Sequence, residues 1–323
     1  MKSFKRVALV IGAIFVLGFP LVVSTSYYVH ILLMVYLFAA LGVGWNLIGG
    51  YGAQLSLGHS VFFAIGAYVP VLLMLNFKIS PLIGGIVGAA LAVLAAAVIG
   101  LPCFRLRGPY FALATIAAAE IARTLLLHFQ TVTGGANGLP IPFRGENAFN
   151  LQFATKVPYY YMALALLVAV FLLVRYLEKE RIGLYLAAIR EDQDAAESLG
   201  VKTMRVKLIA YMLSAAIAAA AGQIYSFTVA YIDPDGVASI NLSVEIAIVA
   251  IVGGIGRLWG PVLGSAVVIL LTELTNIYLG ARRSGASLVL YGLLLVIVIL
   301  LRPDGLISLF DRRSPALNRR AGN

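Results

Sequence analysis

The sequence predicts an all-α, polytopic integral membrane protein, and three observations support this fold class. Hydrophobic residues make up 61% of the 323 residues, charged residues only 12%, and the mean hydropathy is +0.97. A soluble domain of this length would lack the polar surface that it needs to face water. Apolar runs of about 20 residues, the length that crosses a bilayer as a helix, recur along the chain. The single cysteine, Cys103, excludes an internal disulfide and a multi-cysteine metal site.

Ten apolar runs are candidate membrane spans: 7–23, 27–49, 61–77, 81–104, 110–129, 158–177, 207–232, 244–257, 259–280 and 285–301. The run 244–257 is short for a full crossing, which indicates a half-helix or a re-entrant segment. We therefore expect about 8–10 transmembrane helices with glycine-broken re-entrant segments, in a single domain that covers residues 1–323. The first run also fits a cleavable signal peptide, because basic residues precede it, and this alternative stays open.

The net charge of +10 is best explained by membrane topology. The basic residues stand at the ends of apolar runs and form no patch interleaved with aromatic residues, so we expect no nucleic-acid partner. With the N-terminus in the cytoplasm, 18 of the 24 basic residues fall inside, five fall outside, and Arg123 lies within a span. The five outside residues are Lys78, Arg144, Lys156, Arg282 and Arg283. The positive-inside rule thus predicts that both termini are cytoplasmic.

One polar stretch, residues 178–207, interrupts the apolar pattern and is called the polar island below. Twelve of its 30 residues are charged, and apolar runs flank it on both sides. Small apolar residues at helical spacing predict one or two short helices on the cytoplasmic face, and Gly200 is the expected C-terminal stop. A loop of this length with a defined stop indicates a docking surface, and a solvated connector is the alternative.

The longest outside loop, residues 130–157, contains the string GGANG at 134–138 together with prolines. These residues predict tight turns. The loop is either a compact extracytoplasmic cap that contacts a soluble partner or a solvated linker.

Two glycine-rich segments interrupt the membrane pattern: GGYGAQLSLGHS at 49–60 and GGIGRLWGP at 253–261. Irregular backbone at membrane depth is tolerated only where protein or a water-filled cavity satisfies its polar groups. The segments therefore either line a translocation path or form turns whose small residues allow close helix packing. Their candidate path residues are Gln54, Ser56, His59, Gly253 and Gly254.

Glu120 and Arg123 stand three residues apart on one face of the fifth predicted span. Each alone would cost about 2.5–3.5 kcal/mol at the centre of a membrane helix. They are candidates for the translocation path, beside a zwitterionic substrate or in a gate, or for a structural ion pair. Glu245 and Glu273 lie nearer to span ends, where side chains reach water more easily. The histidines show no metal-ligand spacing, so we expect no metal and no other cofactor.

Several motifs together resemble a known family. The pattern Asp194-Ala195-Ala196-x-x-x-Gly200, with Ile209 further on, resembles the Glu-Ala-Ala-x-x-x-Gly cytoplasmic loop of ABC importer permeases, although Asp replaces Glu and the final Leu-Pro is missing. It is joined by LRGPYFA at 106–112, GGANG at 134–138, AIRED at 188–192 and GGIG at 253–256 followed by GP. In this order and spacing the chain resembles the LivM-type permeases of branched-chain amino acid ABC importers over residues 40–310.

The resemblance implies a permease domain that passes hydrophobic, branched-chain amino acids through the inner membrane of a bacterium. It implies a second, LivH-type permease, two ATP-binding subunits and an external substrate-binding protein as partners. The polar island would be the coupling loop that docks on an ATPase. Its coupling residues would be Arg190, Glu191, Asp192, Asp194, Ala195, Ala196 and Gly200. The chain has no phosphate-binding Gly-x-x-x-x-Gly-Lys-Ser/Thr motif, so we expect no enzymatic activity of its own.

Other function classes stay open. An ion-coupled secondary transporter would use intramembrane ionisable groups and would need no docking loop. An ABC permease for urea, amides or other amino acids would fit the same motifs, because selection can reside in the binding protein. A membrane enzyme would need a convergent nucleophile, an acid–base pair or a metal cluster, and the sequence displays none.

Overall fold

The computed structural model describes residues 17–20, 25–143, 145–275, 292–293, 296 and 305–309. Within them, seven helical segments are long and apolar enough to span a membrane. They are α2 (Ser26–Asn46) with its π-helical end η1 (Leu47–Tyr51), α3 (His59–Phe77), α4 (Pro81–Cys103), α5 (Pro109–His128), α7 (Val157–Leu177), α10 (Thr203–Val229), and α11 (Pro234–Val237) with α12 (Ile240–Gly254). A shorter apolar helix, α13 (Gly260–Thr275), follows. The all-α membrane fold is confirmed, whereas the predicted span 285–301 and most of 7–23 lie outside the described residues.

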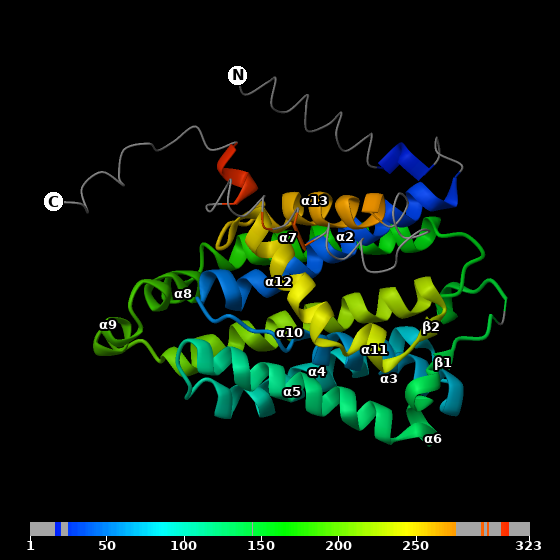
Figure 1. Ribbon diagram of the computed structural model, residues 1–323, viewed down its shortest axis with the longest axis horizontal. Helices are drawn as coiled ribbons and strands as arrows, with labels where there is room; N and C mark the ends of the chain where they lie inside the picture. Colours follow the sequence, from blue (N-terminus) through cyan, green and yellow to red (C-terminus); the bar gives the residue numbers. More distant parts are fainter. Residues whose placement is uncertain are drawn as a thin grey trace.

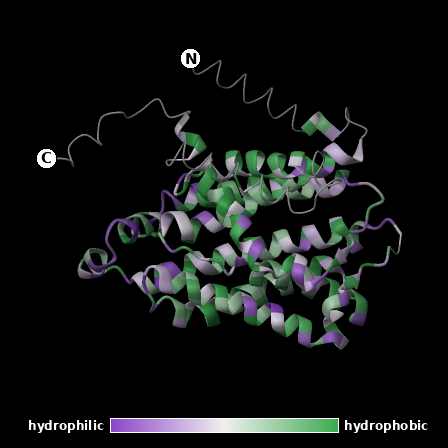
Figure 2. Ribbon diagram, viewed as in Figure 1, coloured by the Kyte–Doolittle hydropathy of each residue, from purple (hydrophilic) through white to green (hydrophobic). Residues whose placement is uncertain are grey.

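Most of the long helices run roughly parallel or antiparallel to one another, α12 crosses them obliquely, and short elements lie at both ends (Figure 1). One end, the α8–α9 end, carries α8 (Arg181–Glu191) and α9 (Gln193–Ser198). The other, the β1–β2 end, carries α6 (Gln130–Thr133), η2 (Gly135–Asn137), η3 (Ala148–Asn150) and the antiparallel pair of β1 (Leu139–Pro140) and β2 (Tyr231–Ile232). The 3-10 helix η5 (Leu306–Leu309) packs on α12 and α13. Figure 2 shows apolar residues along the helices and more polar ones at the two ends.

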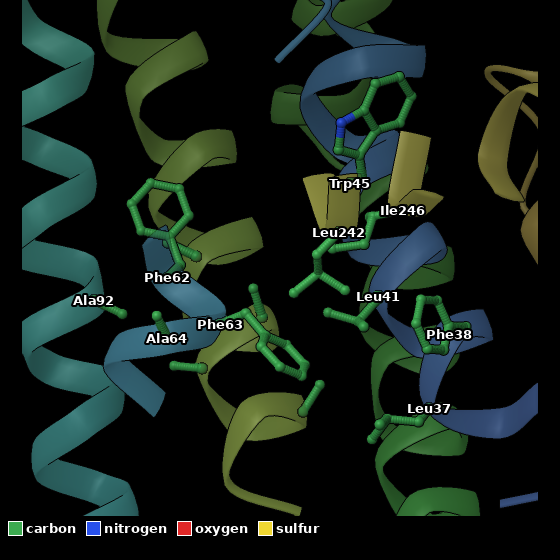
Figure 3. Close-up of a cluster of buried hydrophobic side chains, with 14 of the residues drawn as sticks. Leu37, Phe38, Leu41, Trp45, Phe62, Phe63, Ala64, Ala92, Leu242 and Ile246 are labelled. Carbon is green, nitrogen blue, oxygen red and sulfur yellow. The ribbon is translucent and has the colours of Figure 1, made fainter. Parts of the chain in front are cut away.

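Helix α2 is the central helix of the fold. In its most apolar window 89% of the residues are buried, against 22% for α4 and for α5, so α2 is enclosed while α4 and α5 face outward. Figure 3 shows the side chains that α2, α3 and α12 contribute to the core, among them Leu37, Phe38, Leu41, Trp45, Phe62, Phe63, Leu242 and Ile246.

Small residues set the close spacing of α3, α4 and α10. A Cβ on Gly66 would lie 1.9 Å from the carbonyl oxygen of Ala219, and one on Gly222 would lie 2.1 Å from that of Phe63. The backbones of α3 and α10 therefore touch, as is common for helices in membranes. The buried stripe of α4 has the same character and consists of Gly84, Gly88, Ala92, Ala96, Gly100 and Cys103.

Both predicted breaks in the helical pattern are present, but the expected half-helix at 244–257 is not. After η1 the chain is irregular through residue 58, and a second interruption separates α12 from α13. Helix α12 begins at Ile240, before the apolar run, because Ser239 Oγ accepts a hydrogen bond from the Leu242 N–H (3.3 Å) and caps the helix. With α11 directly before it, this segment is long enough to span a membrane.

Candidate functional site

The polar island folds into two short helices joined at Asp192. This residue is extended (φ −156°, ψ 114°), and its Oδ1 accepts hydrogen bonds from the N–H groups of Asp194 (2.9 Å) and Ala195 (3.0 Å). Asp192 thus ends α8 and caps the N-terminus of α9. Gly200, at φ +87°, follows α9, where a side chain would strain the backbone. The short helices and the glycine stop agree with the sequence pattern.

An ion pair connects α9 to the loop between α4 and α5. Arg107 donates from Nη2 to Asp194 Oδ1 (2.8 Å) and from Nη1 to Oδ2 (3.0 Å), so the contact is bidentate. The hydrogen bond and the charge of Asp194 raise the pKa of Arg107. Both side chains are about two-thirds exposed (64% and 68%), so water screens this contact.

Two further contacts join α9 to the first turns of α10. Lys207 is 1% exposed, and its Nζ donates to Gln193 Oε1 (2.6 Å) while lying 5.9 Å from the centre of the Phe104 ring. Thr203 Oγ1 donates to Glu197 Oε1 (2.5 Å), and this bond, with a second from Gln193, lowers the pKa of Glu197. The anchors Lys207 and Gln193 were not among the residues predicted from sequence. The sequence did hold a signal for Lys207. It stands four and seven residues before Tyr211 and Ser214, so all three share one face of a helix.

The predicted coupling residues divide into an outward and an inward group. Ala196 is 2% exposed and packs toward the protein. The exposed ones are Arg190, Glu191, Asp192, Asp194, Ala195 and Gly200. Sequence analysis missed Leu199, which is 85% exposed beside Gly200. Such an apolar side chain in water is the kind of anchor that a protein partner covers.

The two glycine-rich breaks meet next to α8. Asn46, which is 1% exposed, accepts from the Gly256 N–H (2.9 Å) and donates to the Arg257 carbonyl (3.1 Å). A Cβ on Gly50 would lie 2.6 Å from the Gly256 nitrogen, and one on Gly256 would lie 2.0 Å from Arg190 Nη1. Arg190 of the polar island therefore lies directly against the junction of both breaks.

Close backbone packing accounts for Gly253 and Gly254. A Cβ on Gly253 would lie 1.8 Å from the Gly260 carbonyl oxygen, and one on Gly264 would lie 1.9 Å from that of Val249. Gly254 has φ +132°, a conformation open mainly to glycine. The second break is thus a tight contact between α12 and α13, the alternative that the sequence left open.

The first break carries a buried polar group, the His59 cluster, made of Ser56, His59 and Ser214. His59 Nδ1 lies 3.1 Å from Ser56 Oγ, and its Nε2 lies 2.8 Å from Ser214 Oγ. All three residues are at most 1% exposed. Ser214 follows Thr203 by 11 residues, which is roughly 16 Å along α10, so the break reaches well into the membrane-spanning region.

Side chains from several helices satisfy the backbone of this break. Trp45 Nε1 donates to the Ser56 carbonyl (2.7 Å), and the Leu57 N–H donates to Thr115 Oγ1 (3.0 Å). Gln54 is different, because its Oε1 is buried without a hydrogen-bond partner in the described part of the chain. An unpaired buried acceptor is costly, so Gln54 is a poorly satisfied position in the break.

Glu120 and Arg123 lie apart from this cluster. Arg123 Nη1 lies 2.8 Å from Glu120 Oε1, and Arg123 also contacts Asp235 Oδ1 through Nε (2.7 Å) and Nη2 (2.6 Å). Asp235 belongs to α11, so the triad ties α5 to the β1–β2 end. Sequence analysis missed Asp235 because it stands outside the apolar runs. Among the predicted path residues, the structure brings Ser56 and His59 into contact but not Glu120 and Arg123 with them.

The loop 130–157 is folded at the β1–β2 end. Tyr159 Oη donates to the Leu151 carbonyl (2.7 Å), Gln152 Nε2 donates to that of Pro142 (2.7 Å), and β1 pairs with β2. Phe143 and Phe149 are 59% and 71% exposed on this cap. The described residues of the loop thus form an ordered surface with exposed aromatic rings.

Comparisons with known proteins point to one family. Residues 27–299 match the family model described as the permease component of the branched-chain amino acid transport system. The chain is 31% identical to the high-affinity branched-chain amino acid transport system permease protein LivM of Salmonella typhimurium, over 95% of this chain and 75% of that protein. It is 30% identical to LivM of Escherichia coli K12, over 94% and 75%. It is also 23% identical to LivH of Salmonella typhimurium, over 84% and 91%.

Proposed function

Since the chain belongs to the permease components of branched-chain amino acid transport systems and is of the LivM type, we propose that it passes branched-chain amino acids into a bacterial cytoplasm, driven by ATP hydrolysis on partner subunits. It is a multi-pass protein of the inner membrane. Its partners in this proposal are a LivH-type permease, two ATP-binding subunits and an extracytoplasmic substrate-binding protein. Both termini and the α8–α9 end face the cytoplasm, and the β1–β2 end meets the binding protein.

The observation that carries this proposal is the bracing of α9. A coupling element must be stiff, because a loose loop would absorb the movement of the ATPase. Helix α9 is held by Arg107 on one side and by Thr203 and Lys207 on the other, while Leu199 is left 85% exposed. A rigid helix with one exposed apolar anchor suits insertion into a groove of an ATP-binding subunit.

Two contact routes lead from this surface into the membrane region. One runs from α9 through Lys207 along the face of α10 that carries Tyr211 and Ser214, which stand in helical register, and ends at the His59 cluster. The other runs from α8 through Arg190 to the junction of the two breaks. Rigid movement of α8 and α9 would therefore shift both breaks together.

We place one part of the translocation path at the first break. Gln54, Ser56 and His59 supply polar groups deep in the membrane region, and Gln54 Oε1, which has no hydrogen-bond partner among the described residues, offers an acceptor. Gly253 and Gly254 support the path by allowing the close packing beside it. Glu120 and Arg123 act as a structural brace with Asp235.

The test is co-purification of the ATP-binding subunits with a tagged chain that carries Leu199→Asp. Burying a carboxylate at a central contact costs about 2 kcal/mol or more, so retention of the ATP-binding subunits should fall roughly 30-fold. Phe149→Asp is the matched control, because Phe149 is equally apolar and 71% exposed at the opposite end. A substitution at the predicted coupling residue Ala196, such as Ala196→Glu, would not test docking. Ala196 is buried, so its replacement would disrupt α9 itself.

Each outcome decides between the proposed importer and an alternative. Loss of the ATP-binding subunits with Leu199→Asp but not with Phe149→Asp supports docking at α9. Full retention with Leu199→Asp contradicts docking there. If no ATP-binding subunit accompanies the unmodified chain, and leucine uptake follows an ion gradient instead of ATP, an ion-coupled carrier replaces the importer. ATP-driven uptake of urea in place of leucine, isoleucine or valine would keep the importer and change its substrate.

A further inference from the structure

A cavity of about 480 Å³ opens between α2, α10, α12 and α13 toward the β1–β2 end. The ends of α10 and α11, at Val229 and Gly236, line it, and β2 lies between these two positions in the chain. The cavity is therefore far from α8 and α9 and separate from the His59 cluster. Its volume is in the range of sites that bind small molecules.

The lining of the cavity is divided between an apolar floor and a polar mouth. The floor residues Met34, Phe38, Leu242 and Ile269 are between 5% and 8% exposed. The polar lining residues His30, Asn241, Glu245 and Glu273 are all more exposed than the floor. A molecule that fits this division has an apolar part on one side and charged groups on the other.

Glu245 is the lining carboxylate that has no partner among the described residues. Its side chain is half-buried on a membrane-spanning helix, and within the described residues it forms no hydrogen bond and no ion pair. Glu273 also lines the cavity and accepts a hydrogen bond from Tyr27 (3.1 Å), and no lysine or arginine is among the lining residues. A carboxylate in a membrane-spanning segment is costly unless a cation pairs with it, so these side chains favour a positively charged ligand.

We propose that this cavity is a binding site for the permeant amino acid within a single permease chain, with the ammonium group on Glu245 and the apolar side chain on the floor. The proposal rests on the function proposed above and adds a residue-level site to it. A simple cation would satisfy Glu245 as well, but it would leave the apolar floor without a role.

The spacing on α12 suits the two charged groups of an α-amino acid. These groups are attached to one carbon, so their acceptor and donors must lie within about one helical turn. Asn241 and Glu245 are four residues apart on one helix face, about 5–6 Å between their Cβ atoms. The Asn241 amide and the backbone N–H groups of Ile240 and Asn241 supply donors for the carboxylate, since the Leu242 N–H already donates to Ser239, while Glu245 accepts from the ammonium.

The experiment uses alkylation of a cysteine in the cavity, since Cys103 is the one cysteine in the sequence. Cys103→Ala supplies the background and Thr272→Cys places a thiol on the cavity lining. In the complex in nanodiscs without ATP, leucine should slow alkylation by N-ethylmaleimide. Glycine, which lacks the side chain, and 4-methylpentanoate, which lacks the ammonium, should not. Adding Glu245→Gln should weaken the protection by leucine roughly tenfold or more, because a charge-assisted hydrogen bond is lost.

Controls separate this proposal from the importer function itself. Leu274→Cys, on the same helix but not on the lining, should show no protection, and Glu180→Gln at the other end should leave protection unchanged. Three outcomes would each contradict the proposed site. They are equal protection by leucine and 4-methylpentanoate, protection by sodium ions alone, and undiminished protection with Glu245→Gln. If uptake of leucine is ATP-driven and yet no protection occurs, the site fails while the importer function stands; uptake without ATP would overturn the function instead.

Discussion

Helix α9 and the cavity near the β1–β2 end differ in how their charged side chains are paired. At the α8–α9 end, Asp194, Gln193 and Glu197 each contact a side chain of another element, and the buried Lys207 has both an acceptor and an aromatic ring. At the β1–β2 end, Glu245 faces a cavity without a partner in the described residues. Internal pairing makes a surface rigid, whereas an unpaired group retains its affinity for a ligand. In the proposed importer, this difference would separate a part that transmits force from a part that binds the substrate.

Packing also differs between the junction of the two breaks and the cavity. Where the two breaks meet near α8, glycine backbones are in direct contact and leave no room for a single added carbon. Toward the other end the helices separate around about 480 Å³ of space. Dense packing transmits displacement because it resists compression. We therefore expect substitutions near the α8–α9 end to affect folding and coupling, and substitutions in the cavity to affect binding.

The largest effect should come from Gly253→Ala. The new Cβ would lie 1.8 Å from the Gly260 carbonyl oxygen, so α12 and α13 must separate, at a cost of about 3 kcal/mol. The measurement is the fraction of monodisperse protein after detergent extraction, which should fall sharply. Gly200→Ala is the control. A Cβ at this position would meet no neighbouring atom, but the backbone has φ +87°. The substitution should therefore cost only the backbone strain of about 1–2 kcal/mol. Similar losses in both variants would mean that packing at the second break is not tight.

The sequence predicted the fold class well because membrane spans depend on run length and hydropathy, which are local properties. It misjudged α12, since the start of that helix depends on the cap at Ser239 and on the preceding α11. It could not show that the breaks meet, because Asn46 and Gly256 are 210 residues apart in the chain. Contacts of this kind follow from the packing of whole helices, and no short pattern records them.

The next largest effect concerns Lys207. Lys207→Met keeps the length and the apolar stem but removes the hydrogen bond to Gln193. A bond to a charged group contributes about 1.5–3 kcal/mol, so amide exchange in residues 193–198 should accelerate roughly 10-fold or more. ATPase stimulation in the complex should fall with it. The exposed Lys202, replaced by Met in the same way, should change exchange little. Unchanged exchange with Lys207→Met would show that α9 does not depend on α10.

Glu245→Gln should have a smaller effect, and it should stabilise the protein where the preceding substitutions destabilise it. Glu245 has no partner among the described residues, so removing its charge from the span relieves a desolvation cost. The free energy of unfolding should therefore rise by roughly 1 kcal/mol, less than the full cost at a helix centre. Thermal unfolding in detergent measures this change. Glu120→Gln is the paired counterpart: it breaks the triad with Arg123 and should lower stability. If Glu245→Gln also lowers stability, then Glu245 is not free and the contrast between the two ends is lost.

The candidate site was predictable to the extent that it depends on composition. The polar island, its glycine stop and the polar residues of the first break stand out in an apolar chain. The cavity could not be predicted in this way, because its floor residues Met34, Phe38 and Ile269 are ordinary apolar residues on two different helices. Leu199 was missed for a similar reason, since only the fold shows that it points into water and that Ala196 does not.

The smallest effect should come from the ion pair between Arg107 and Asp194. Both side chains are mostly exposed, so a double-mutant cycle with Arg107→Ala and Asp194→Ala should give a coupling energy below the three effects above. The coupling should weaken further as salt rises, because the Debye length falls from about 10 Å at 0.1 M to about 3 Å at 1 M. The same cycle for Lys207 and Gln193, whose contact is partly buried, should be less sensitive to salt. Equal salt dependence of the two couplings would place Lys207 in contact with water. The buried link from α9 to α10 would then no longer explain how the α8–α9 end transmits force.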